Sequence, residues 1–220
     1  MKRPILKRGS RGLTVVELLV VTAITIILMA LGLPTIGHVF VRGKTADTLQ
    51  RLRNLQLANQ SYTAEHNGRF MPLYAGPGVF EFGWKWNGEF LSYLGLSEAD
   101  IGSRQWEKVM RSPFWNESSA PHAEIAYHSD SEGYHSARLT NPAMLVAFID
   151  ANDWWVNKYA FADWPGPDAD GKLSAPTPAY RHAGRKAAAV TYAGNVLMLT
   201  QEDLDWTDSR GAKHWVPTAQ

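Results

Sequence analysis

The chain contains no cysteine, which excludes a disulfide framework and any metal site built from thiolates. Its 220 residues include 22 basic and 21 acidic side chains. Five of the basic residues fall within the first 12 positions, so the rest of the chain holds 17 basic and 21 acidic residues, a formal charge of −4. We therefore expect no nucleic acid partner, because a broad basic surface is lacking. Hydrophobic packing has to hold the fold together.

Acidic residues are absent from the first 16 positions, and one charge interrupts the apolar run that follows. This run covers residues 13–33, and Glu17 is its only charged side chain. As a helix, 21 residues reach about 31 Å, enough to cross the hydrocarbon core of a bilayer. By the positive-inside rule, the preceding basic residues keep the amino terminus in the cytoplasm. The bulk of the chain is then expected on the other side of the membrane.

The sequence Arg11-Gly12-Leu13-Thr14-Val15-Val16-Glu17 resembles the leader of type IV prepilins, in which a peptidase cuts after a glycine and methylates the new amino terminus. The resemblance implies cleavage between Gly12 and Leu13 by a prepilin peptidase/methyltransferase. Glu17 is then the fifth residue of the mature chain. In this family, that glutamate pairs with the free amino group of a neighbouring subunit. The implied partners are other pilin or pseudopilin subunits, preceded by lipid of the bacterial inner membrane.

Two other interpretations of the segment stay open, a secretory signal peptide and a plain membrane anchor. A secretory peptide has a charge-free apolar core of roughly 7–15 residues and a small-x-small cleavage site. Ala30-Leu31-Gly32 matches such a site poorly, and Glu17 is left unexplained. An ionised side chain at mid-bilayer costs about 2.5–3.5 kcal/mol, so a glutamate there needs a partner.

The remaining sequence predicts one globular domain behind this segment. The expected parts are a basic leader (1–12), a transmembrane or filament-core helix (13–33), its amphipathic continuation (34–65) and an extracytoplasmic head (66–220). Pro34, Gly37 and Gly43 are expected to kink or soften the helix. Its continuation has apolar residues at three- to four-residue spacing, which predicts a face that packs on a sheet: Leu49, Leu52, Leu55, Ala58 and Tyr62. His66-Asn67-Gly68 predicts its end.

The head is predicted to follow this helix with an antiparallel sheet, so the fold class is α+β and pilin-like. Short helices are expected near 89–94 and 104–111. Strands are expected at 124–127, 144–149, 187–192 and 196–200. Gly194-Asn195 is typical of a two-residue turn between the last two strands.

The carboxy-terminal third is similar to pilin-like families of planctomycete- and verrucomicrobium-type bacteria that end in a His…Asp-Gly motif. Arg181-His182-Ala183-Gly184 carries this resemblance, but Ala193-Gly194 stands where Asp-Gly is usual. His182 and Asp150 could form a general-base pair, yet no nucleophile motif, HExxH sequence or phosphate loop accompanies them. We therefore expect no enzyme, and a structural role for His182.

Two further hypotheses concern ligands of the head. Asp168 and Asp170 precede Gly171 in a fragment of the pattern used by calcium loops, although a solvated Pro/Gly loop is the alternative. Trp84 and Trp86, among nine tryptophans, could stack on sugar rings, although tryptophan also fills cores and interfaces. Trp154 and Trp155 would point to opposite faces of a strand.

The function expected from these patterns is structural. The chain is predicted to be a subunit, typical of a minor one, of a type IV pilus-like or type II secretion pseudopilus filament. It is expected in the inner membrane as a single-pass protein with a periplasmic head, and then in a periplasmic or surface filament. The alternative is a membrane-tethered, Trp-rich carbohydrate-binding surface protein.

Overall fold

The computed structural model describes residues 14–73, 83–115, 123–131, 134–159 and 176–215, with the side chains of 31–38 and 130 excepted. The chain forms two units, Met1–Phe40 and Val41–Gln220. The helices are α1 (Val15–Glu65), α2 (Gly88–Ser92), α3 (Arg104–Met110) and α4 (Ser209–Ala212). The strands are β1 (Glu124–His128), β2 (Val146–Ala151), β3 (Trp155–Val156), β4 (Ala187–Thr191) and β5 (Val196–Leu199). The second unit is therefore α+β, as predicted.

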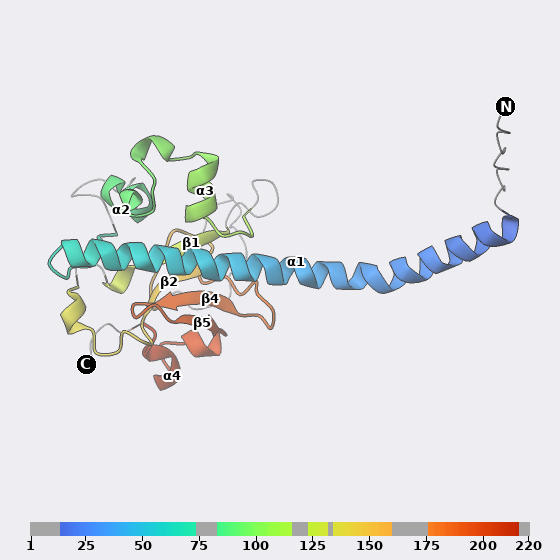
Figure 1. The fold of residues 1–220 in the computed structure, drawn as a ribbon. Coiled ribbons are helices and arrows are strands. Elements are labelled where there is room, and N and C mark those ends of the chain that lie inside the picture. Colours follow the sequence, from blue (N-terminus) through green and yellow to red (C-terminus); the bar gives the residue numbers. More distant parts are fainter. Residues whose placement is uncertain (1–13, 74–82, 116–122, 132–133, 160–175, 216–220) are drawn as a thin grey trace, which may run out of the picture. The chain divides into compact units, whose positions relative to one another are not determined.

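In the second unit, α1 has one buried and one exposed face. Leu52 and Leu55 are fully buried, and Ala58 and Tyr62 are nearly so, whereas Leu57 is 61% exposed. This matches the predicted spacing, because residues three and four apart share one side of a helix. Figure 1 shows this part of α1 lying across the sheet.

The carboxyl end of α1 follows the predicted stop signal. Asn67 and Gly68 adopt positive φ angles of 52° and 79°, which a helix cannot continue through. The N–H of Gly68 donates to the carbonyl of Thr63 at 2.8 Å, so one of the last helical carbonyls is satisfied. Pro34 and Gly43, by contrast, lie within α1 and do not end it.

The sheet has the strand order β3-β1-β2-β4-β5. Neighbouring strands are antiparallel except β3, which pairs with β1 in parallel. The four predicted strands are all present with shifted ends. The sequence did not indicate β3, because a two-residue strand has no periodicity to detect.

The hairpin between β4 and β5 has a different turn from the predicted one. Val190 pairs with Val196, and the N–H of Thr191 donates to the carbonyl of Asn195 at 2.9 Å. The loop therefore has three residues, 192–194, and its last residue, Gly194, has a φ of 88°. This is the geometry of a type I turn closed by a left-handed glycine. The prediction of a two-residue Gly194-Asn195 turn was wrong.

Both faces of the sheet are buried, which explains why β2 and β4 contain no exposed residue. On the α1 side, Tyr127 and Phe148 join the helix residues and the tryptophan-rich segment in one cluster. On the other side, Val146, Leu204 and Trp215 belong to a second cluster. A register shift in β2 between Val146 and Phe148 changes which face each side chain occupies. The second unit thus has three layers, α1 with the tryptophan-rich segment, the sheet, and the carboxy-terminal segment.

Candidate functional site

The helix of the first unit begins with a capping box. The carboxylate of Glu17 accepts hydrogen bonds from the backbone N–H and the hydroxyl of Thr14, at 2.8 and 2.9 Å. In return, the Thr14 hydroxyl accepts from the N–H of Glu17 at 3.2 Å. Both residues satisfy backbone donors that a helix start leaves free, and a negative charge suits this end of the helix dipole. The sequence analysis missed this second role for Glu17, although the Thr-x-x-Glu spacing could have indicated it.

Behind the cap, α1 exposes apolar side chains over all of its faces. Val15 is 77% exposed, and even Val20 and Ile24 are 52% exposed. The larger set also contains, in chain order, Val16, Leu18, Leu19, Val21, Ile26, Ile27, Leu28, Met29, Val39 and Phe40. Contiguous apolar surface of this extent is rare on a protein that functions alone in water. Among the described residues, this surface is the strongest candidate for a functional site.

Where side chains are described, none of the helices carries an apolar stretch long enough to cross a membrane.

Two of the predicted sites fall outside the described residues. Gly12 and Leu13, at the expected cleavage point, precede residue 14. Asp168 and Asp170, the expected calcium ligands, lie within 160–175. In the part of the chain that is described, no group of three or more His, Cys, Asp or Glu side chains could hold a metal ion.

The structure contradicts the stacking role predicted for Trp84. This side chain is fully buried, its ring packs edge-on against Phe90 and Phe148, and its indole N–H donates to the carbonyl of Trp154. No face of its ring is left for a sugar. Trp86 is partly buried and contacts Trp106 and Trp154. The alternative weighed from the sequence, a core of tryptophans, is confirmed for Trp84.

Trp154 and Trp155 also differ from the expectation that they point to opposite faces. Both are partly buried and pack against the cluster on the α1 side of the sheet. Only Trp155 belongs to β3, so strand alternation does not extend to Trp154.

Lys85 lies beside these tryptophans and is 1% exposed. Its ammonium group lies 2.5 Å from the carboxylate of Glu124. Burial lowers the pKa of Lys85, and the negative charge of Glu124 opposes this effect. The pair joins the tryptophan-rich segment to the start of β1.

His182 and Asp150 form a second buried pair, as the sequence suggested. Nε2 of His182 lies 3.0 Å from Oδ2 of Asp150, and neither side chain is exposed. The other ring nitrogen, Nδ1, lies 2.9 Å from the hydroxyl of Thr45 on α1. Arg181 places its Nε 3.6 Å from Oδ1 of Asp150. The cluster therefore ties α1 to β2 and to the segment before β4.

The connectivity Thr45–His182–Asp150 has the order of a nucleophile, a base and an acid. However, the Thr45 hydroxyl also bonds to the carbonyl of Val41 at 2.9 Å, within its own helix. None of the three residues lines either of the two pockets described below. This geometry suits a structural cross-link better than an active site.

Ala193, where the His…Asp-Gly pattern has aspartate, is exposed at the tip of the last hairpin. Its backbone N–H donates to the carbonyl of Pro142 at 2.9 Å. The carboxylate that pairs with His182 is that of Asp150 instead. Thus the pair does not depend on position 193.

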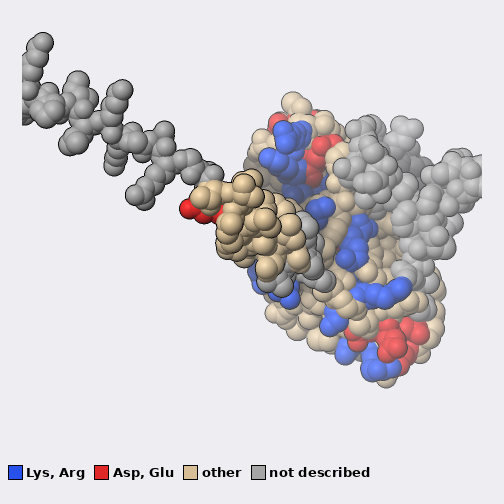
Figure 2. All heavy atoms as spheres, turned by 90° about the vertical axis from the view of Figure 1, so that its right-hand side faces the viewer, with Lys and Arg blue, Asp and Glu red and all other residues tan. Residues whose placement is uncertain are grey.

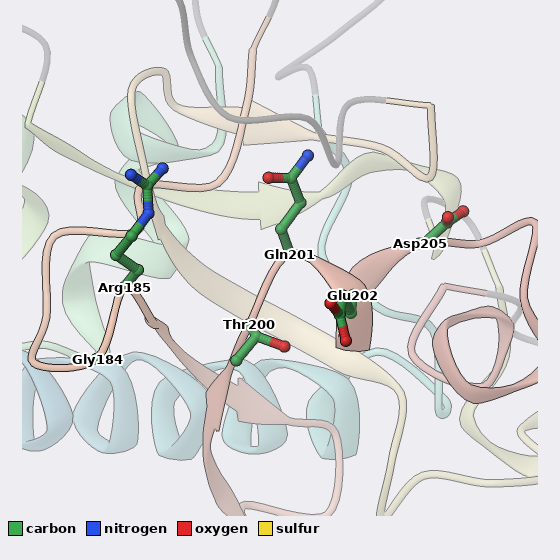
Figure 3. Close-up of a pocket in the computed structure, with 6 residues that line it drawn as sticks. All are labelled: Gly184, Arg185, Thr200, Gln201, Glu202 and Asp205. Atoms are coloured by element: carbon green, nitrogen blue, oxygen red, sulfur yellow. The ribbon is translucent and has the colours of Figure 1, made fainter.

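Two of the pockets of the second unit are lined by described residues. One, of about 400 Å³, is lined by Gly184 and Arg185 before β4 and by Thr200, Gln201, Glu202 and Asp205 after β5, so it carries charges of both signs (Figure 3). The other, of about 320 Å³, lies beside the last turns of α1. There the side-chain amides of Gln56 and Gln60 donate to the carbonyl of Tyr192, at 2.8 and 3.2 Å.

No protein-family model, curated protein or solved structure matches the chain. Its function has to be inferred from its own residues.

Proposed function

We propose that this chain is a structural subunit of a type IV pilus-like or type II secretion pseudopilus filament. A prepilin peptidase cuts it after Gly12 and methylates Leu13. The apolar helix first sits in the inner membrane, and then packs against the helices of other subunits. The head lies in the periplasm and later coats the filament.

The observation that carries this proposal is the exposed apolar surface of α1 in the first unit. Burial of apolar surface is worth about 25 cal/mol per Å², so leaving these thirteen large apolar side chains in water is costly. Lipid or neighbouring helices remove this cost. Apolar side chains on every face of the helix suit both environments in turn.

Glu17 supports a filament rather than a plain anchor. Both capping contacts to Thr14 use one carboxylate oxygen, Oε2. Among the described residues, the other oxygen has no hydrogen-bond partner. It is therefore available to the amino group of a neighbouring subunit. When such a charge pair is removed from water, deleting one of its partners costs about 2–5 kcal/mol of binding free energy.

The test compares two substitutions at the same helix end. Glu17→Ala removes the cap and the carboxylate, whereas Thr14→Ala disrupts the cap and leaves the carboxylate. Both should enter the membrane. We expect Glu17→Ala alone to reduce the amount of chain in filaments sheared from cells. Equal loss in both variants would mean that Glu17 acts only through helix capping, and normal incorporation of Glu17→Ala would remove its role in assembly.

A further inference from the structure

The second unit carries cations and aromatic rings where the chain enters it. Arg42 and Lys44 are exposed and follow the exposed apolar residues Val39, Phe40 and Val41. The ammonium group of Lys44 lies 5.2 Å from the ring centre of Phe114. Phe114 in turn packs edge-on against His182, which contacts Thr45, the residue after Lys44 on α1. These contacts place Phe114 beside the first turns of α1 in this unit.

A second pair of the same kind adjoins the first. The guanidinium group of Arg111 lies 4.2 Å from the ring centre of Trp115. Arg51 on α1 donates to the backbone carbonyl of Arg111 at 2.9 Å, which ties this pair to the same stretch of helix. Phe114 and Trp115 are both partly exposed. We name the five residues Arg42, Lys44, Arg111, Phe114 and Trp115 the basic collar.

The acidic side chains around the collar are already paired. Asp47 forms an ion pair with Arg51 at 2.7 Å. Glu124 lies 2.5 Å from Lys85 and 3.6 Å from Arg111, and Glu107 lies 4.0 Å from Arg111. In the ranges that the structure describes, no carboxylate lies within salt-bridge distance of Arg42 or Lys44. The collar therefore keeps an excess of positive charge.

Three further carboxylates, those of Glu65, Glu89 and Glu98, lie near the carboxyl end of α1. Glu65 accepts a hydrogen bond from Tyr93, and Glu89 lies 3.1 Å from His66. Glu98 packs against Gly88 at the start of α2. On α1 itself, Arg42 and Lys44 lie at the start of this unit and Glu65 lies at the end of the helix, although the chain beyond its first 12 residues is acidic as a whole. Figure 2 shows one face of this unit on which more Lys and Arg than Asp and Glu are visible.

We propose that the basic collar docks the head on the anionic headgroups of the membrane before the subunit enters a filament. This rests on the proposed function, because the helix that precedes Arg42 has to be in the bilayer. Lys and Arg next to a membrane segment reach the phosphate layer with their charged ends. Tryptophan prefers the same layer, since it is apolar with one polar group. Each cation near an anionic surface adds to the affinity.

The absence of cysteine makes the experiment direct, because one introduced cysteine takes a spin label at one place only. The label is attached to Pro113→Cys, between Arg111 and Phe114, in the full chain placed in lipid nanodiscs. The discs contain either phosphatidylcholine alone or phosphatidylcholine with half phosphatidylglycerol. Both carry the same trace of lipid with a nickel-chelating headgroup. Broadening of the label's spectrum by nickel reports the fraction of heads that lie on the headgroups.

We expect broadening in the anionic discs that is weak in the neutral discs and falls as salt is added. The double variant Arg42→Gln/Lys44→Gln should lower the docking equilibrium roughly 30-fold, since two cations near the surface are lost. The matched control, Arg69→Gln/Arg138→Gln, removes the same charge from exposed positions beyond the carboxyl end of α1 and should change little.

Three other results would overturn the proposal. Equal broadening in neutral and anionic discs would remove the role of anionic lipid. Equal loss in the two double variants would mean that net charge acts, not the collar. If the chain does not remain bound to either kind of disc, both the docking proposal and the membrane stage of the proposed function are wrong. This outcome can be told apart from a failure of docking alone, because it is seen before any spectrum is recorded.

Discussion

The hydroxyl of Thr45 lies 2.9 Å from Nδ1 of His182, a residue 137 positions further along the chain. Through Nε2, the same ring reaches the buried carboxylate of Asp150. One side chain therefore joins α1, β2 and the segment before β4. Its second partner, Thr45, lies only four residues from the start of the second unit.

Replacing His182 by alanine should lower the free energy of unfolding by about 3–5 kcal/mol, because Asp150 stays buried without its nearest partner. Thr45→Val removes the contact with His182 and the bond to the Val41 carbonyl within the helix, and leaves the His182–Asp150 pair in place, so it should cost less, about 0.5–1.5 kcal/mol per bond. Urea denaturation in detergent, followed by tryptophan fluorescence, measures both. Equal costs for the two variants would mean that the buried carboxylate gains little from His182.

Trp84→Ala should cost about 3–5 kcal/mol of stability, because it opens a cavity in the core and leaves the carbonyl of Trp154 with one bond fewer. Tyr159→Ala, at an aromatic position that is 65% exposed, is the control and should change the unfolding midpoint little. The same urea measurement applies. A stable Trp84→Ala protein would contradict the assignment of this tryptophan to the core.

Gly43 and Gly68 have different backbone conformations, so replacing each by alanine should change stability in opposite directions. Gly43 lies within α1, and a Cβ built there meets nothing within 4 Å. Gly43→Ala should therefore raise stability by about 0.5–1 kcal/mol. Gly68 has a φ of +79°, and its Cβ would lie 2.6 Å from the ring of His135, so Gly68→Ala should be destabilising. Thermal melts of the two variants give both signs.

His214 should make stability depend on pH. Burial lowers the pKa of this ring from its ordinary 6.5, and its Nδ1 lies 2.7 Å from the carbonyl of Met144. The unfolded chain then binds the proton more tightly than the folded one does. The stabilisation that the neutral, buried His214 ring gives to the folded state is fully present above pH 6.5. It is lost as the pH falls below 6.5 and through the lower pKa of the folded state.

The measurement compares the wild type with His214→Gln by urea denaturation at several pH values between 5 and 8. The difference in their free energies of unfolding should shrink as the pH falls, because only the wild type loses this contribution. A difference that is independent of pH would show that His214 does not titrate as described.

Much of the fold could be predicted because it depends on local patterns. The spacing of Leu52, Leu55 and Ala58 predicted the face of α1, and Asn67-Gly68 predicted its end. The turn after β4 was misjudged, since a glycine that ends a three-residue loop looks the same in sequence as one that starts a two-residue loop. The carboxy-terminal layer with Trp215 was not expected either, because no periodicity connects it to the sheet.

For the functional residues too, local features could be predicted and contacts between distant parts of the chain could not. Glu17 and the apolar run are local features, so the sequence revealed them, although the cap with Thr14 was missed. The pairing of His182 with Asp150 could only be suggested, since 32 positions separate them. The burial of Trp84 could only be named as the alternative to sugar stacking, because it depends on packing among residues from distant parts of the chain.

The filament proposal is tested most directly by the intact mass and amino-terminal sequence of the chain isolated from its native membrane. We expect a chain that begins at N-methylated Leu13, because only the prepilin pathway produces that terminus. A chain that still begins at Met1, or one cut near Gly32, would contradict the proposal that this protein is a filament subunit.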